Sequence, residues 1–320
     1  MIWPFDTSIE SLWLALYLAS FALHAVFVSY VAAGTGYALV AALRRSADPI
    51  AARARDWLPF MLGAGITAGV GPLLFLQLLH QRRFYTANLL LGPRWGAVVP
   101  ALILGFYALY LAKASERWRR LALAIGVACF LFVAWSWTEL HLVMQADRAW
   151  RAMYGAGERF YLDVAVVPRL AIWLGAMLAL FATVAAWPAA PAERRRLAAL
   201  ALVGIIVCGA TLAAARSIQG GFDPAHGWSY LLAAAATVAA VGWGWTARRP
   251  DGPGLAVVTA ATTAALAAGA IVREAPRIAL ARTSATALEA GGALLFVVTA
   301  AVGIAAIAWV IRTVRGLEPR

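Results

Sequence analysis

The chain is poor in charged residues, in cysteine and in histidine. Only 13% of its 320 residues are charged, 63% are hydrophobic and the mean hydropathy is +0.77. A soluble domain is typically about one quarter charged, so this composition excludes that class and predicts a polytopic membrane protein. The two cysteines, Cys129 and Cys208, lie inside apolar runs and belong to no CxxC or CxxCH motif. A zinc knuckle and covalent haem attachment by the usual motif are therefore excluded.

Acidic residues are also scarce. There are 15 Asp and Glu against 27 Lys and Arg, and the net charge is +12. In a soluble chain this excess would suggest a nucleic-acid partner. Here the arginines lie in short connections between apolar runs, as the positive-inside rule describes. We therefore expect the lipid bilayer, and no nucleic acid, as a partner.

Apolar windows of about 20 residues predict an all-α, polytopic membrane bundle of about nine transmembrane helices. The windows cover residues 10–42, 57–80, 95–113, 120–143, 165–187, 195–215, 227–247, 254–272 and 288–312. Most of the Lys and Arg fall on one side if the N-terminus is outside and the C-terminus cytoplasmic. This distribution predicts a multi-pass protein of the bacterial inner membrane in that orientation.

The two halves of the chain differ in composition. Residues 1–187 carry three of the four histidines, whereas residues 188–320 are rich in Ala, Val and Gly. We expect a front bundle (1–187) that carries the functional groups and a back bundle (188–320) that serves packing or partner contact.

The fourth window ends in three chemically active side chains, Glu139, His141 and Met144. An ionisable residue at the centre of a membrane helix costs roughly 2.5–3.5 kcal/mol, so we expect a compensating role. Glu139 could pair with an arginine, relay protons or bind a quinol hydroxyl. Arg169 and Arg216 lie on the same side of the predicted bundle and could pair with Glu139 or hold haem propionates. Interfacial snorkelling of these arginines is the alternative.

The histidines His24, His80, His141 and His226 fall in one layer of the predicted bundle. Neutral imidazole is a common ligand of haem iron, and His–His or His–Met pairs hold b-type haem. His141 and Met144 share one helix face, so each would need a partner from another helix, such as His24. An interhelical hydrogen bond, or an interfacial position for His80 and His226, is the competing interpretation.

The second window contains Gly65 and Gly69 at GxxxG spacing, followed by Pro72. This spacing lets another helix or a flat macrocycle approach closely, and helix packing is the simpler use. Pro72 predicts a kink because it frees a backbone carbonyl.

These features together resemble subunit I of the cytochrome bd quinol oxidases. The resemblance covers about residues 8–216 and rests on the segment 21–28 around His24, on 65–69, on Phe84-Tyr85, on Gly92 and on Trp137 with 143–145. It implies that His24 corresponds to the haem-ligating histidine of the family's first helix.

The chain departs from that family at three places. The family's third-helix glutamate falls near 99–101, its fifth-helix histidine near 167–169, and its long quinol-binding loop is reduced to 217–226. The resemblance therefore implies the scaffold, with a haem or without one, and argues against an oxygen-reducing oxidase.

Three functions follow from these observations. The first is a membrane subunit of a respiratory electron-transfer complex that binds haem b and links the quinone pool to an outer-face redox partner. That partner would be an extracytoplasmic cytochrome or an iron–sulfur protein, next to other membrane subunits. The second is a cofactor-free anchor for such an assembly. The third, a transporter, lacks support because no convincing inverted repeat is visible.

Overall fold

The computed structural model describes residues 9–156, 164–219, 226–250 and 252–281, and six single positions (298, 301, 302, 305, 309 and 312). Every regular element in these residues is helical, which confirms the all-α class. Eight helices are long and apolar enough to cross a membrane. They match the first eight predicted windows, and the ninth window, 288–312, lies almost wholly outside the described residues.

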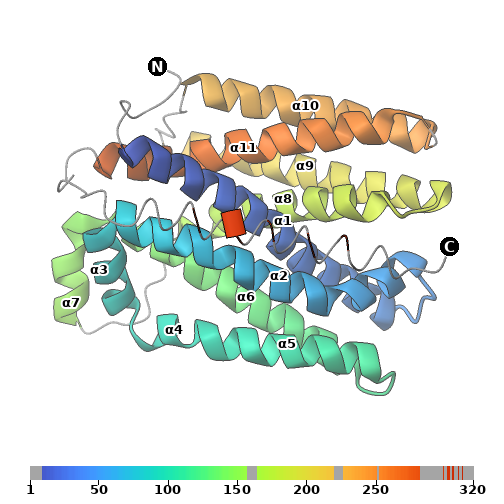
Figure 1. Ribbon diagram of the computed structural model, residues 1–320, viewed down its shortest axis with the longest axis horizontal. Helices are drawn as coiled ribbons and strands as arrows, with labels where there is room; N and C mark the ends of the chain where they lie inside the picture. The colour runs from blue at the N-terminus through green and yellow to red at the C-terminus, as the bar shows by residue number, and fades with distance from the viewer. Residues whose placement is uncertain are drawn as a thin grey trace.

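The bundle consists of long helices with short ones at one end. The long helices are α1 (Ile9–Leu43), α2 (Pro49–Leu79), α5 (Val98–Ala114), α6 (Arg119–Val143), α8 (Val166–Ala186), α9 (Pro191–Gln219), α10 (His226–Arg248) and α11 (Gly254–Ala281). The short ones are α3 (Gln81–Leu91), α4 (Pro93–Gly96), a 3-10 turn (Asp147–Ala149) and α7 (Trp150–Ala156). We call the end of the bundle that carries α3 and α7 the α3/α7 end; it lies on the left of Figure 1.

Helix α1 is the central element of the bundle. It packs against α2, α6, α8 and α11, while α5 pairs with α6, α8 with α9, and α10 with α11 (Figure 1). Residues from both predicted halves share one hydrophobic cluster, in which Leu58 and Phe181 pack with Leu197, Trp243 and Val258. Side chains of α1 can therefore meet groups that are far apart in the sequence.

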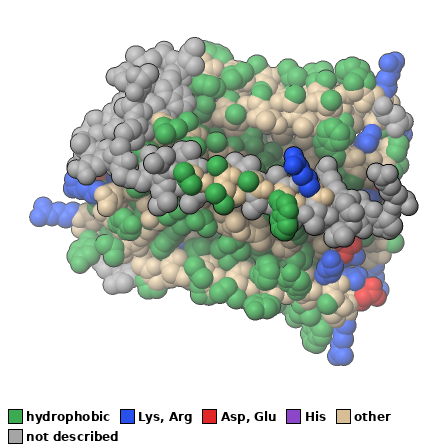
Figure 2. All heavy atoms as spheres, viewed as in Figure 1, with side chains coloured by type: hydrophobic (Ala, Val, Ile, Leu, Met, Phe, Trp, Pro, Cys, Tyr) green, Lys and Arg blue, Asp and Glu red, His purple; other side chains and the backbone are tan. Residues whose placement is uncertain are grey.

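The flank of the bundle is apolar. Large hydrophobic side chains such as Leu23, Phe60, Leu89, Ile206 and Val241 are exposed. On the face that Figure 2 shows, hydrophobic side chains are spread over the described part of the flank, and most Lys and Arg lie near its two ends. A water-soluble protein rarely exposes so extended an apolar surface, so the flank is suited to contact with lipid.

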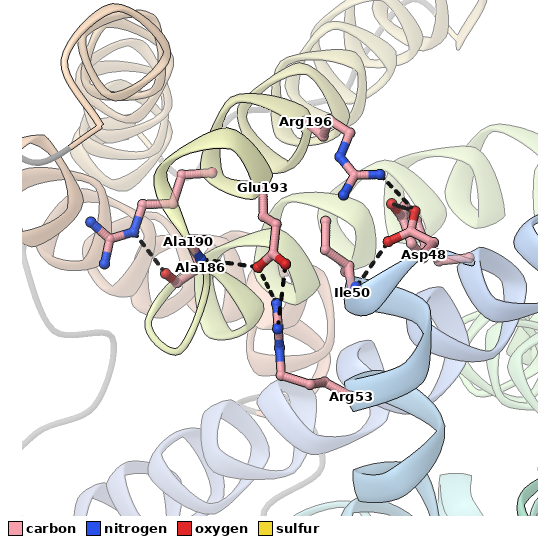
Figure 3. A network of polar contacts seen from close by, with 9 residues as sticks. Asp48, Ile50, Arg53, Ala186, Ala190, Glu193 and Arg196 are labelled. Carbon is pink, nitrogen blue, oxygen red and sulfur yellow. Dashed lines mark hydrogen bonds and ion pairs between the residues drawn. The ribbon is translucent and has the colours of Figure 1, made fainter. Parts of the chain in front are cut away.

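Polar contacts join the connections at the opposite end, on the right of Figure 1. The Asp48 carboxylate caps α2 by accepting from the Ile50 amide at 2.8 Å, and it accepts from Tyr37 at 2.8 Å and from Arg196 at 2.9 Å. Arg53 and Glu193 form an ion pair beside it (Figure 3). These contacts fix the start of α2 against the start of α9.

The boundaries of two helices differ from the sequence prediction. Helix α2 begins at Pro49 and not at 57, because Asp48 supplies its N-terminal cap. Helix α11 continues to Ala281, although residues beyond 272 were expected to form a connection. Glu274 and Arg277 lie in this extension of the helix and form a buried i, i+3 ion pair.

Candidate functional site

Glu139 forms a buried ion pair at the α3/α7 end of α6. Its side chain is 0% exposed and pairs with Arg94 of α4, which is also buried. The other carboxylate oxygen accepts from the indole nitrogen of Trp135 at 2.9 Å. Both oxygens of Glu139 are therefore bound by groups of the chain itself.

Glu139 pairs with Arg94. The sequence had suggested Arg169 and Arg216 as candidate partners. Arg94 follows Pro93 in the short helix α4, which turns the chain back onto α6 before α5 begins. Arg169 lies in the first turn of α8, where its charge acts on His141. The side chain of Arg216 lies outside the described residues.

A second buried charge cluster joins α11, α1 and α6. Glu274 forms ion pairs with Arg273 and with Arg277, and Arg277 Nη2 lies 2.5 Å from the carboxylate. The same nitrogen donates to the Tyr17 hydroxyl at 2.9 Å, while Arg277 Nη1 lies 3.5 Å from Met144 Sδ. Two guanidinium groups thus share one carboxylate in this cluster.

Arg273 extends the cluster toward the middle of α1. Its guanidinium lies 4.8 Å from the centre of the Phe21 ring and 5.4 Å from the Trp173 ring. Tyr17, Phe21 and His24 lie one turn apart along the same face of α1, so this face meets α11 through two of them.

His24 has the best-defined imidazole geometry of the predicted ligands. Its Nδ1 lies 2.8 Å from the Gly65 carbonyl oxygen on α2. A carbonyl oxygen can only accept, so Nδ1 carries the proton and a neutral His24 has its lone pair on Nε2. The ring lies against Gly69, where an added Cβ would approach His24 Cε1 to 2.8 Å. The GxxxG spacing therefore accommodates this side chain.

His80 and His141 are both buried at the α3/α7 end, each 6% exposed. The Nδ1 atom of each is buried and has no hydrogen-bond partner among the described residues. The charge of Arg277 acts on both rings, and His80 acts on His141. Burial and then the charge of Arg277 lower the pKa of His80, which lies just beyond the end of α2, from 6.5 to about 4.

Among the predicted groups, His24 has the hydrogen-bond arrangement of a metal ligand, whereas Met144 and Glu139 already have partners in the chain. His24 presents a neutral imidazole whose second nitrogen is fixed, as in a metal ligand. The Met144 sulfur faces the Arg277 guanidinium, and the Glu139 oxygens are bound by Arg94 and Trp135. Neither of these two groups is available to an iron or a quinol without losing its present partner.

Sequence reasoning missed Arg94, Arg273, Glu274, Arg277 and Tyr17. The Glu-x-x-Arg spacing of 274 and 277 was a usable signal, because it places opposite charges on one face of a helix. No comparable local pattern links Arg94 to Glu139, since they are 45 positions apart. The predicted residue His226 begins α10, and its side chain lies outside the described residues.

Comparison with known proteins adds no relative to this picture. The chain matches no protein-family model, no curated protein and no solved structure. The geometry of the polar groups within the membrane bundle is therefore the basis for any functional proposal.

Proposed function

We propose that the protein is a membrane subunit of a respiratory electron-transfer complex that binds haem b through His24. The observation that carries this proposal is the hydrogen bond of 2.8 Å between His24 Nδ1 and the Gly65 carbonyl. Metal-ligating histidines commonly donate their other ring nitrogen to a backbone carbonyl, which fixes the tautomer and the ring orientation. When bound, the haem supplies one-electron transfer.

The residues around His24 have separate roles in this proposal. The Gly65 carbonyl oxygen accepts a hydrogen bond from His24 Nδ1, and the absence of a side chain at Gly69 leaves space for the ring between α1 and α2. Arg169, in the first turn of α8, remains the predicted partner of a haem propionate. Glu139 acts as a positioning residue, because its pairing with Arg94 holds α4 against α6.

The electron partners follow from the membrane setting. A quinone in the bilayer reaches the apolar flank of the helices directly, and a redox protein would dock at the α3/α7 end. That end exposes Tyr154, at 83%, together with Arg148 and Arg151. In this proposal the protein lies in a bacterial inner membrane with the α3/α7 end outside, beside other membrane subunits.

The test is the haem content of the full chain purified from a haem-replete membrane. We expect a reduced Soret band and α-band in the optical spectrum, together with extractable haem b. His24→Ala should lose both signals, while His80→Gln, which replaces a buried histidine at the α3/α7 end, should keep them.

Two results would reject the haem proposal. One is a wild-type protein without extractable haem, and the other is a folded His24→Ala variant with unchanged haem content. Either result favours the second function, a cofactor-free membrane anchor of a respiratory assembly. That alternative is supported by the pairing of Glu139 with Arg94 and by the contact of the Met144 sulfur with Arg277, because both predicted groups have partners within the chain.

A further inference from the structure

The cluster around Arg277 contains more buried positive charge than the described carboxylates neutralise. Arg273 and Arg277 both pair with Glu274, and no second carboxylate pairs with either arginine within the described part of the chain. The side chains of Arg277 and Glu274 are 2% and 0% exposed, and the side chain of Arg273 is 20% exposed. An uncompensated charge is expensive to keep in a membrane interior, so a compensating anion is expected there.

Three buried nitrogen atoms of this neighbourhood have no hydrogen-bond partner among the described residues. They are Arg277 Nε, His80 Nδ1 and His141 Nδ1. The arginine nitrogen can only donate, and each imidazole nitrogen donates when it carries the ring's proton. The missing partner of Arg277 Nε is therefore an acceptor, and each histidine also needs an acceptor when its Nδ1 carries the proton.

The three groups belong to one part of the bundle. His141 lies one turn before Met144 on α6, and the Met144 sulfur lies 3.5 Å from Arg277. His80 follows the last turn of α2, where Leu76 packs in the same hydrophobic cluster as Met144 and Tyr17. The charge of Arg277 acts on both histidines, and His80 acts on His141.

We infer that Arg277, His80 and His141 bind a small monovalent anion of the size of chloride, in a site whose excess positive charge is supplied by Arg273. The near-complete burial of the surrounding side chains sets the size limit, because Tyr17, Met144, Arg277 and Glu274 are all at most 2% exposed. Arg277 and the histidines supply N–H donors, and Glu274 keeps Arg277 in place. This inference does not depend on the binding of haem.

The experiment uses the full chain purified in detergent with sodium gluconate as the salt, since gluconate is too large for such a site. Radioactive chloride is titrated at constant ionic strength, and thermal unfolding is followed in parallel by tryptophan fluorescence. We expect one saturable chloride site per chain. The midpoint of thermal unfolding should be higher in chloride than in gluconate by roughly 2 °C or more. Bromide should give the same stabilisation as chloride.

Arg273→Gln is the informative variant, because it removes the excess charge and leaves the Glu274–Arg277 pair intact. Its chloride affinity should fall at least about tenfold, which corresponds to about 1.4 kcal/mol. His80→Gln replaces one proposed donor and should weaken binding by roughly three- to tenfold. Arg82→Gln is the matched control, because Arg82 is exposed at the same end of the bundle. The chloride affinity of this variant should equal that of the wild type.

Three results would overturn the inference. They are the absence of saturable chloride binding to the wild type, equal stability in chloride and gluconate, and an unchanged affinity in Arg273→Gln. The first two would mean that water occupies the site. Haem content, measured on the same samples, separates this inference from the proposed function, since each can fail alone.

Discussion

The Arg94 guanidinium lies 3.5 Å from the centre of the Trp135 indole ring, and the nitrogen of that indole donates to Glu139, the carboxylate with which Arg94 pairs. One arginine thus makes a cation–π contact and an ion pair with two residues that are one turn apart on α6. This arrangement compensates the carboxylate that made the end of α6 conspicuous in the sequence.

The Arg94–Glu139 pair provides the first prediction. Glu139→Gln should destabilise the protein by about 3–5 kcal/mol, because it removes the buried carboxylate with which the buried Arg94 guanidinium forms its ion pair. The double variant Arg94→Gln with Glu139→Gln should be more stable than Glu139→Gln alone. Thermal unfolding of the three proteins in one detergent measures the coupling. Additive losses in the double variant would contradict a direct pair.

The packing of His24 on α2 provides the second prediction. Gly69→Ala places a Cβ 2.8 Å from the His24 ring, so we expect a loss of about 1–3 kcal/mol and a lower haem content. Gly63→Ala is the control on the same helix, because nothing lies within 4 Å of its added Cβ. That variant should be stabilised by roughly 0.5–1 kcal/mol through its better helix propensity. Equal effects at the two glycines would contradict the proposed contact.

The close approach of α8 and α9 provides the third prediction. A Cβ at Gly175 would lie 2.6 Å from the Gly204 carbonyl oxygen, which is backbone and cannot rotate away. Gly175→Ala should therefore separate the two helices and cost about 1–3 kcal/mol or more. Gly209→Ala on α9 has open space around its Cβ and serves as the control. A Gly175→Ala protein with the midpoint of the control would refute the contact.

The fourth prediction concerns the pH dependence of stability. The pKa of His80 is lowered to about 4 in the folded protein, against 6.5 for the ordinary side chain. Below pH 6.5 the unfolded chain therefore binds a proton that the folded chain does not, and stability falls until the pH reaches about 4. At pH 5 the loss should be about 2 kcal/mol relative to pH 8.

His80→Gln tests this prediction because glutamine does not titrate. Chemical unfolding between pH 4 and pH 8 should show a shallower fall in stability for the variant than for the wild type. The Arg82→Gln protein should follow the wild-type curve, since Arg82 is exposed. Parallel curves for His80→Gln and the wild type would show that another group is responsible for the pH dependence.

Much of the fold was available from the sequence. The apolar windows predicted the eight helices that the structure describes as long enough to span a membrane. Their ends agree within a few residues except at the start of α2 and the end of α11. This succeeds because each membrane helix satisfies its own backbone hydrogen bonds, so its existence depends on local composition. The predicted ligation of haem by His24 and His141, the quinone site and the N-terminus outside remain predictions.

The composition of this chain determined by itself that it is a polytopic helical membrane protein, and it marked Glu139, His141 and His24 as groups that need compensation. Only the tertiary structure decided the partners: Arg94 for Glu139, Gly65 for His24, and Glu274 with Tyr17 for Arg277. The reason is physical. A membrane-spanning helix is defined by the hydropathy of about 20 consecutive residues, whereas the pairing of a buried charge depends on which helices lie side by side.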